Sequence, residues 1–421
     1  MFAYLVEHNR YLNIIGILVI TIIAIIFSKN HRAINPRVIL SSLLVHILFA
    51  YLMLKTTIGV TIIEKVAHAA QTLYLFADQG IEFMFGKLSD ANSAWGFVFA
   101  IKVLPVIIFI GALTGLLFHW GIIQRIVAGM NWLIRPLIGT SGVETTSAIS
   151  NSILGQTEAA LFMNNYIHVM TKSELFVMMC SGMAAISIPV LIIYIVLGIP
   201  GNHLLTATLL SIPASIFIAK ILVPETESSL TADNPIVKFE KSTTNSFDAI
   251  SKGTMDGLKL AIAVAAMLIS FLSLLAMINY LLSMGGDYVN QIFDYYQMAW
   301  HIPELSLALL MSYLFAPFAY LLGFSGDKLW EAGKLLGIKV STNELIAFTQ
   351  LAKMSIAPRD FIILVYALCG FSNFSCVGIQ IGMISALAPE KKHIITQLGF
   401  YAVLGSSLAN LLSAMIVGLL L

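Results

Sequence analysis

The sequence predicts an all-α polytopic membrane protein with about eight transmembrane helices, interfacial helices and two re-entrant hairpins. Of its 421 residues, 58% are hydrophobic and only 11% are charged, and the mean hydropathy is +0.90. Soluble domains carry about 25% charged residues, so this composition excludes an ordinary soluble fold. The net charge is +1, which offers no basic surface to nucleic acid and excludes it as a partner.

Long apolar runs supply the spanning helices, because about 20 mostly apolar residues are needed to cross the hydrocarbon core. The clearest runs cover residues 14–27, 38–54, 97–118, 175–197, 204–223, 258–282, 305–322, 361–384 and 398–421. Several of them contain Gly or Pro, and together they predict about eight or nine spans.

Three regions are polar enough to lie outside the membrane, namely residues 57–93, 224–255 and 283–303. The first mixes charged, aliphatic and aromatic residues, which favours amphipathic helices along the interface. The second is rich in Ser, Thr, Asn and acidic residues and predicts a flexible connection between two halves. The resulting divisions are N-terminal transmembrane helices with an interfacial helix at 1–96, a first repeat at 97–223, an extramembrane connection at 224–256, and a scaffold helix with the second repeat at 257–421.

Two further regions, 140–170 and 338–354, each contain an apolar stretch too short to cross the membrane, interrupted by polar residues around Glu158 or Glu344. Each region is followed by a long apolar run with a break, at 185–189 after the first and at 370–375 after the second. A re-entrant hairpin followed by a broken helix, once in each half, is typical of secondary transporters built from inverted repeats. Irregular backbone persists at membrane depth only where it is buried in protein or lines a cavity, so these breaks are the predicted binding region.

The polar residues in these regions are candidate ligands, because an ionised carboxylate in a membrane helix costs about 3 kcal/mol and usually has a function. Gln156, Thr157 and Glu158 combine an amide, a hydroxyl and a carboxylate, a set that suits a ligand with both donors and acceptors. Glu158 is alternatively an interfacial carboxylate at the end of a span. Glu344 follows Ser-Thr-Asn, and this pattern indicates a helix-capping sequence as readily as a binding site. For Asn373 the alternative to ligand binding is a hydrogen bond to a neighbouring helix.

Catalytic readings have little support, since the sequence lacks HExxH, a CxxC pair and a Walker loop. We therefore expect a non-enzyme without a cofactor. Two other classes stay open from the residues themselves: a membrane-embedded enzyme with Glu158 and Glu344 as acid and base, and a passive channel.

Several motifs match one known family in its order from about residue 97 to the C-terminus. They include Gly155-Gln-Thr-Glu-Ala159, Met170-Thr-Lys-Ser-Glu-Leu175, Leu336-Gly-Ile-Lys339, Ala367-Leu-Cys-Gly-Phe-Ser-Asn-Phe-Ser375 and Leu408-Ala-Asn-Leu-Leu-Ser413. On these motifs the chain closely resembles the concentrative nucleoside transporters, in the short bacterial form of a nucleoside permease.

The resemblance implies an elevator transporter that acts as a homotrimer in the bacterial inner (plasma) membrane and carries nucleosides such as uridine into the cell by cation-coupled symport. The expected partners are the nucleoside, the coupling cation, membrane lipid and two further copies of the chain. It also implies roles for single residues. Gln156, Thr157 and Glu158 would contact the nucleobase with Val190 packed against it, Glu344 and Asn373 would bind the ribose hydroxyls, and Phe371 and Cys376 would line the site.

The family's sodium site would correspond to Asn151, Leu154, Ala185 and Ile186, with Leu154 and Ile186 acting through backbone carbonyls. Ala185 stands where a Ser or Thr hydroxyl is expected. Ile188-Pro189 and Ala160 also depart from the family's pattern. Sodium is the favoured coupling ion on this resemblance, and the proton is the alternative, with Glu158 or Glu344 as the titrating group.

Overall fold

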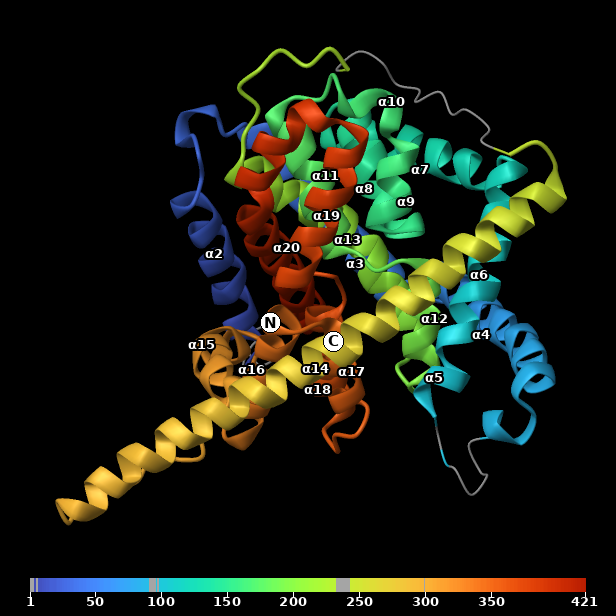
Figure 1. Cartoon of the computed structure of the whole chain (residues 1–421). Helices are drawn as coiled ribbons and strands as arrows, with labels where there is room; N and C mark the ends of the chain where they lie inside the picture. The colour runs from blue at the N-terminus through green and yellow to red at the C-terminus, as the bar shows by residue number, and fades with distance from the viewer. Residues whose placement is uncertain (1–3, 5–6, 91–95, 97, 232–242, 299) are drawn as a thin grey trace.

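The computed structural model describes residues 4, 7–90, 96, 98–231, 243–298 and 300–421, and in this part of the chain the regular structure is entirely helical (Figure 1). Seven of the described helices are long and apolar enough to cross a membrane: Glu7–Ile26, Pro36–Lys55, Phe99–His119, Lys172–Val196, Gly201–Leu222, Ser246–Tyr295 and Pro389–Leu420. Two shorter apolar helices, Leu307–Leu321 and Phe374–Leu387, accompany them. The chain is thus a polytopic helical membrane protein, as its composition predicts.

The N-terminal part contains α2 (Arg10–Ile26), α3 (Pro36–Lys55) and α4 (Thr57–Phe85). Residues 57–93 are predicted to be interfacial helices, and the structure has one 29-residue helix there, followed by a short 3-10 turn, η3 (Gly86–Ser89). The buried residues of α4 lie three, four or seven positions apart, at Ile63, Ala67, Ala70, Ala77 and Ile81. That spacing is the single apolar stripe of an amphipathic helix. Residues 91–95 and Phe97 lie outside the described residues.

The helix α14 (Ser246–Tyr295) differs most from the prediction, because its 50 residues extend into both expected flanking loops (Figure 1). It begins at Asn245, whose side chain accepts a hydrogen bond from the Asp248 N–H. Residues 246–255 are therefore helical rather than flexible, and so are residues 283–295. Polarity alone does not end a helix, and the sequence has no proline between Ser246 and Tyr295. Residues 232–242 of the predicted connection lie outside the described part.

The helices α5 (Phe99–Lys102) and α6 (Leu104–His119) precede the first hairpin, and α6 packs along α14 through glycines. A Cβ on Gly111 would lie 2.6 Å from the Gly253 carbonyl oxygen, and one on Gly257 would lie 2.7 Å from the Ile107 carbonyl oxygen. Each helix carries its glycines four residues apart, at Gly111 and Gly115 and at Gly253 and Gly257. Small residues at this spacing let two helix backbones touch.

The first hairpin follows α7 (Ile122–Ile138) and consists of α8 (Gly142–Leu154) and α9 (Gln156–Phe162), with α10 (Asn164–Ile167) after it. A capping box formed by Ser141 and Glu144 starts α8. The tip is Gly155, whose φ of +96° is open to glycine and strained for other residues. The tip therefore presents Gln156 as the first residue of the returning helix.

The first broken helix is α11 (Lys172–Ala184) followed by α12 (Ile188–Val196), with residues 185–187 between them. Pro189 lies in the first turn of α12, where the missing N–H costs no helical hydrogen bond. The next helix is α13 (Gly201–Leu222). The unwound segment is therefore shorter than the predicted break at 185–189, since Ile188 and Pro189 are already helical.

The second repeat has the same order of elements. The helix α15 (Leu307–Leu321) leads into a hairpin of α16 (Asp327–Ser341) and α17 (Glu344–Leu351), which begins well before the predicted 338. The helices α18 (Pro358–Leu368) and α19 (Phe374–Leu387) form the second broken helix, and η4 (Pro389–Lys391) and α20 (Lys392–Leu420) end the chain. The observed break spans residues 369–373, since the Asn373 side chain caps α19 and makes Phe374 and Ser375 helical.

The two repeats cross. The ring of Tyr194 in α12 packs on Phe348 in α17 with 4.5 Å between centroids, and α19 contacts α9. The second half of each broken helix thus meets the hairpin of the other repeat. This crossing brings the tips of both hairpins to the breaks and so determines the composition of the site.

Candidate functional site

Glu344 is the centre of a buried polar cluster at the tip of the second hairpin. Its side chain is held at both carboxylate oxygens: the Tyr194 hydroxyl donates to Oε1 at 3.0 Å, and the Asn373 amide Nδ2 donates to Oε2 at 3.0 Å. Glu344 is only 5% exposed. Glu344 is not the helix cap that the sequence leaves open, because the side chain of Asn343 accepts the hydrogen bond from the Ile346 N–H.

Asn373 serves both the helix and the cluster. Its Oδ1 accepts hydrogen bonds from the Cys376 backbone N–H at 3.0 Å and from the Ser375 hydroxyl at 2.6 Å, while its Nδ2 donates to Glu344. Capping thus fixes the amide so that its donor end points at the carboxylate. The structure brings together the two residues for which the sequence predicts ribose binding.

The first hairpin contributes residues of different exposure. Gln156 is buried, and its side chain lies beside the Cys376 side chain in the first turn of α19, so hairpin 1 meets the Asn373 end of that helix. Val190 is also buried and lies in the first turn of α12, and Phe371 is half-buried in the second break. Thr157, by contrast, is exposed. Of the predicted base-contacting residues, Gln156 therefore lies beside Cys376, three residues after the predicted ribose ligand Asn373.

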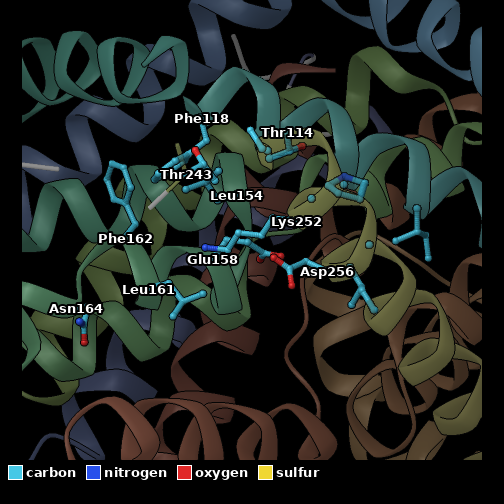
Figure 2. A pocket seen from close by; sticks show the side chains of 18 of the residues that line it. Thr114, Phe118, Leu154, Glu158, Leu161, Phe162, Asn164, Thr243, Lys252 and Asp256 are labelled. Carbon is cyan, nitrogen blue, oxygen red and sulfur yellow. The ribbon is translucent and has the colours of Figure 1, made fainter. Parts of the chain in front are cut away.

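Glu158 is half-buried and lines a cavity of about 360 Å³ between hairpin 1, α6 and α14. Lys252 and Asp256 of α14 line the same cavity, as Figure 2 shows. Further lining residues come from both helices, from α9 and from α12, and include Thr114, Phe118, Leu161, Phe162 and Pro189. Glu344 and Asn373 are not among its lining residues in the described part of the chain, so the cavity reaches hairpin 1 but stops short of the second tip.

The predicted cation ligands lie where hairpin 1 meets the first broken helix. Asn151 is 1% exposed, and its Nδ2 donates to the Met178 carbonyl at 3.0 Å and to the Ser181 hydroxyl at 2.8 Å. Its Oδ1 lies close to Gly182 of α11, where an added Cβ would come within 3.2 Å of it. Leu154 ends α8, and Ala185 and Ile186 lie in the break. Within the described ranges there is no group of three or more His, Cys, Asp or Glu residues that could hold a metal ion.

A hydroxyl does lie at this junction, although Ala185 lacks one. Ser187, two residues further along, is 6% exposed, and a Cβ on Gly155 would come within 2.7 Å of its Cβ and 3.4 Å of its Oγ. The hairpin tip therefore rests directly on the Ser187 side chain. The sequence reading missed this residue because it considered only the family's ligand positions.

Three other residues of the core were missed by the sequence reading. Tyr194 gave no signal beyond a single hydroxyl in an apolar helix. Lys339 was noted only within a motif, but its ammonium donates to the Ala367 carbonyl at 2.9 Å and to Asn410 Oδ1 at 2.7 Å, in a side chain that is nearly fully buried. Asn410 in turn donates to the Ala184 carbonyl at 2.8 Å. A lysine and an asparagine thus connect the C-terminal ends of α11 and α18.

The sequence matches known nucleoside transporters along most of its length. Residues 203–418 match the family described as "Na+ dependent nucleoside transporter C-terminus", residues 15–88 match "Na+ dependent nucleoside transporter N-terminus", and residues 100–200 match "Nucleoside recognition". The "Nucleoside permease NupC" of Helicobacter pylori is 35% identical, with 97% of each chain covered. An "Uncharacterized transporter" of Haemophilus influenzae is also 35% identical, with the same coverage.

Solved structures agree with this relationship. The transporter CNTnw in an inward-facing substrate-bound state is 32% identical, and the match has a TM-score of 0.88 and covers 99% of both chains. A CNTnw variant in an intermediate state gives a TM-score of 0.90 at 31% identity, covering 97% of this chain and 98% of that one. The fold is thus that of an elevator-type transporter. These matches establish that the chain, with its polar cluster at the tip of the second hairpin, belongs to the concentrative nucleoside transporter family, a family of transporters and not of enzymes.

Proposed function

We propose that this chain imports nucleosides into the bacterial cell across the plasma membrane by sodium-coupled symport, with hairpins and broken helices moving together as an elevator. The observation that carries the proposal is the Glu344 carboxylate, held between Tyr194 and Asn373 at the meeting point of both repeats. A nucleoside suits this site, because the ribose can bind at the Glu344 cluster and the base can bind at hairpin 1.

The ribose end is the Glu344 cluster. A vicinal diol donates two hydrogen bonds, and a buried carboxylate is a strong acceptor for both. Asn373 adds an amide that can donate to a hydroxyl oxygen. An analogue without one hydroxyl leaves buried polar groups unpaired, so this end supports discrimination between ribosides and deoxyribosides. Phe371 and Cys376 line the same region.

The base end is hairpin 1. Gln156 contacts Cys376 and so extends the cluster towards the hairpin, and Val190 offers an apolar surface in the first turn of α12. Glu158 lines the cavity, and Thr157 beside it is exposed. The mixture of amide, hydroxyl and carboxylate suits the donor and acceptor edge of a nucleobase.

Sodium is our proposed coupling ion because the hairpin junction has suitable donors. Asn151 Oδ1, the Leu154 and Ile186 carbonyls and the Ser187 hydroxyl are all oxygens, which a hard cation prefers. Ser187 would supply the hydroxyl that Ala185 lacks. Proton coupling through Glu158 or Glu344 is the second candidate, favoured by two carboxylates in the region where substrate would bind.

We further propose a homotrimer held together along α14. Its most apolar 18-residue window is only 6% buried within the single chain, although it is the most hydrophobic of the seven spans. Apolar helices that leave their surface free in one protomer are covered by lipid or by other copies of the chain.

The experiment is uptake of radiolabelled uridine into liposomes that contain the purified protein. An imposed inward sodium gradient should drive accumulation of intact uridine above the external concentration, while an equal proton gradient should not. Acceleration by protons alone would replace sodium with the proton, and equilibration without accumulation under either gradient would reduce the proposal to a passive channel.

A further inference from the structure

We propose that Gln380 in α19 is a further base-reading residue, and that with Gln156 it favours nucleosides whose base carries an exocyclic amino group over those with a keto oxygen at that position. This inference rests on the proposed nucleoside site and adds a substrate preference to it. Neither the sequence reading nor the comparisons point to Gln380.

The position of Gln380 follows from the helix that carries it. The buried residues of α19 are Cys376, Gln380 and Ile384, so one face of the helix points inwards, starting from the Asn373 cap. Asn373 contacts Glu344 at the ribose end, and Cys376 contacts Gln156 at the base end. Gln380 lies one turn beyond Cys376 on this face, which places it on the base side of the site.

Gln380 and Gln156 meet over a glycine of α11. A Cβ on Gly182 would lie 2.7 Å from Gln380 Nε2, 3.1 Å from Gln156 Cβ and 3.2 Å from Asn151 Oδ1. Three amide side chains from hairpin 1 and α19 therefore surround one point on α11. Any larger residue at position 182 would push them apart.

Both glutamines have an acceptor without a donor. Gln380 is 2% exposed and its Nε2 donates to the Met179 carbonyl at 3.0 Å, which fixes Nε2 as the end facing α11 and leaves Oε1 as a free acceptor. Gln380 Oε1 and Gln156 Oε1 are both buried and have no hydrogen-bond donor among the described residues. A buried acceptor without a donor is unfavourable, so these two amide oxygens, on the contacting helices α9 and α19, suit a ligand that brings N–H groups.

The chemistry of the bases decides which ligand suits two acceptors. The amino groups of cytosine and adenine each present two N–H donors. Uracil and hypoxanthine carry a keto oxygen at the same position. This oxygen is an acceptor, so it would be repelled by the two amide oxygens. Leaving a buried acceptor unpaired is costly, so the site should discriminate between bases that differ only in this group.

Two isosteric pairs test this proposal: cytidine against uridine, and adenosine against inosine. Binding to the purified transporter should be at least fivefold tighter for the amino member of each pair. In Gln380→Met, which keeps the volume but removes the acceptor, the amino preference should fall to less than twofold, because cytidine and adenosine lose a hydrogen bond and uridine and inosine lose a repulsion. Gln397→Met on α20 is the matched control, because Gln397 is exposed and pairs with His393, and it should keep the wild-type preference.

Several outcomes would overturn the inference. Equal wild-type affinity for both members of each pair would do so without any variant. An unchanged preference in a folded Gln380→Met protein would remove Gln380 from base reading, and an equal loss for all nucleosides with an altered sodium dependence would assign it to the cation beside Asn151 instead. Absence of binding for every nucleoside would reject the proposed function itself, which is a distinguishable result.

Discussion

The Tyr194 hydroxyl of α12 donates a hydrogen bond to Glu344 Oε1 at 3.0 Å, although the two residues lie 150 positions apart in the chain. The bond connects the first broken helix to the second hairpin. It therefore ties the two repeats together at the place where the ribose is proposed to bind, and it makes both residues sensitive points for substitution.

Glu344→Gln should weaken nucleoside binding about tenfold or more, because an amide nitrogen would replace one of two carboxylate acceptors. Isothermal titration with the purified protein measures the affinity, and size-exclusion chromatography checks the assembly. Glu331→Gln in the same hairpin is the control, since Glu331 is exposed on α16. Unchanged affinity in Glu344→Gln would remove Glu344 from the ribose role.

Tyr194→Phe should weaken binding by a smaller amount, about tenfold at most, because Asn373 still holds the other oxygen of Glu344. A hydrogen bond typically contributes about 0.5–1.5 kcal/mol net, and about 1.4 kcal/mol corresponds to a tenfold change in affinity. Tyr288→Phe is a suitable control, since Tyr288 is 66% exposed on α14. A loss larger than that of Glu344→Gln would contradict the supporting role of Tyr194.

Gly253→Ala should destabilise the α6–α14 pair, because its new Cβ would collide with the Gly111 carbonyl oxygen, a backbone atom that cannot rotate away. Thermal unfolding in detergent should show a lowered midpoint. Gly285→Ala in the same helix has no atom within 4 Å of the new Cβ. It should be neutral or stabilise the helix by up to about 1 kcal/mol, so equal effects of both changes would refute the close crossing.

Lys220→Met should destabilise the protein strongly. Its ammonium pairs with Glu144 Oε1 at 2.6 Å and donates to the Ser173 hydroxyl at 2.9 Å, and both charged residues are nearly fully buried. Removing one partner of a buried pair costs about 3–5 kcal/mol, because the other charge is left unpaired. The same assay of thermal unfolding should find little change in Lys259→Met, whose side chain is 75% exposed. Recovery of stability in Lys220→Met with Glu144→Gln would support the pairing.

Lys339→Met should reduce uptake more than Lys334→Met, its exposed neighbour on α16. The Lys339 ammonium faces the Ala367 carbonyl, near the end of α18, where the helix dipole favours a positive charge. Transport rates in liposomes at matched protein content measure the difference. Equal rates for the two variants would mean that the second break forms without this cation.

Much of the site could be anticipated residue by residue, because a carboxylate or amide in an apolar run is visible locally. Glu158, Glu344, Asn373 and the tip at Gly155 were found this way or by resemblance. The first and last residues of α14 could not be predicted, since polar flanking segments indicate contact with solvent and not the end of a helix. Tyr194 and Gln380 were not found, because one hydroxyl or amide in a helix gives no sign of its partner.

The sequence by itself determined the membrane class and the approximate place of both hairpins and both breaks, because the length of apolar runs and their polar interruptions are local properties of the chain. Only the tertiary structure decided which polar groups meet. Tyr194 finds Glu344 and Asn410 finds the Ala184 carbonyl across 150 and 226 positions. Those contacts arise from the crossing of the two repeats, whose packing brings buried donors to buried acceptors that a linear pattern cannot pair.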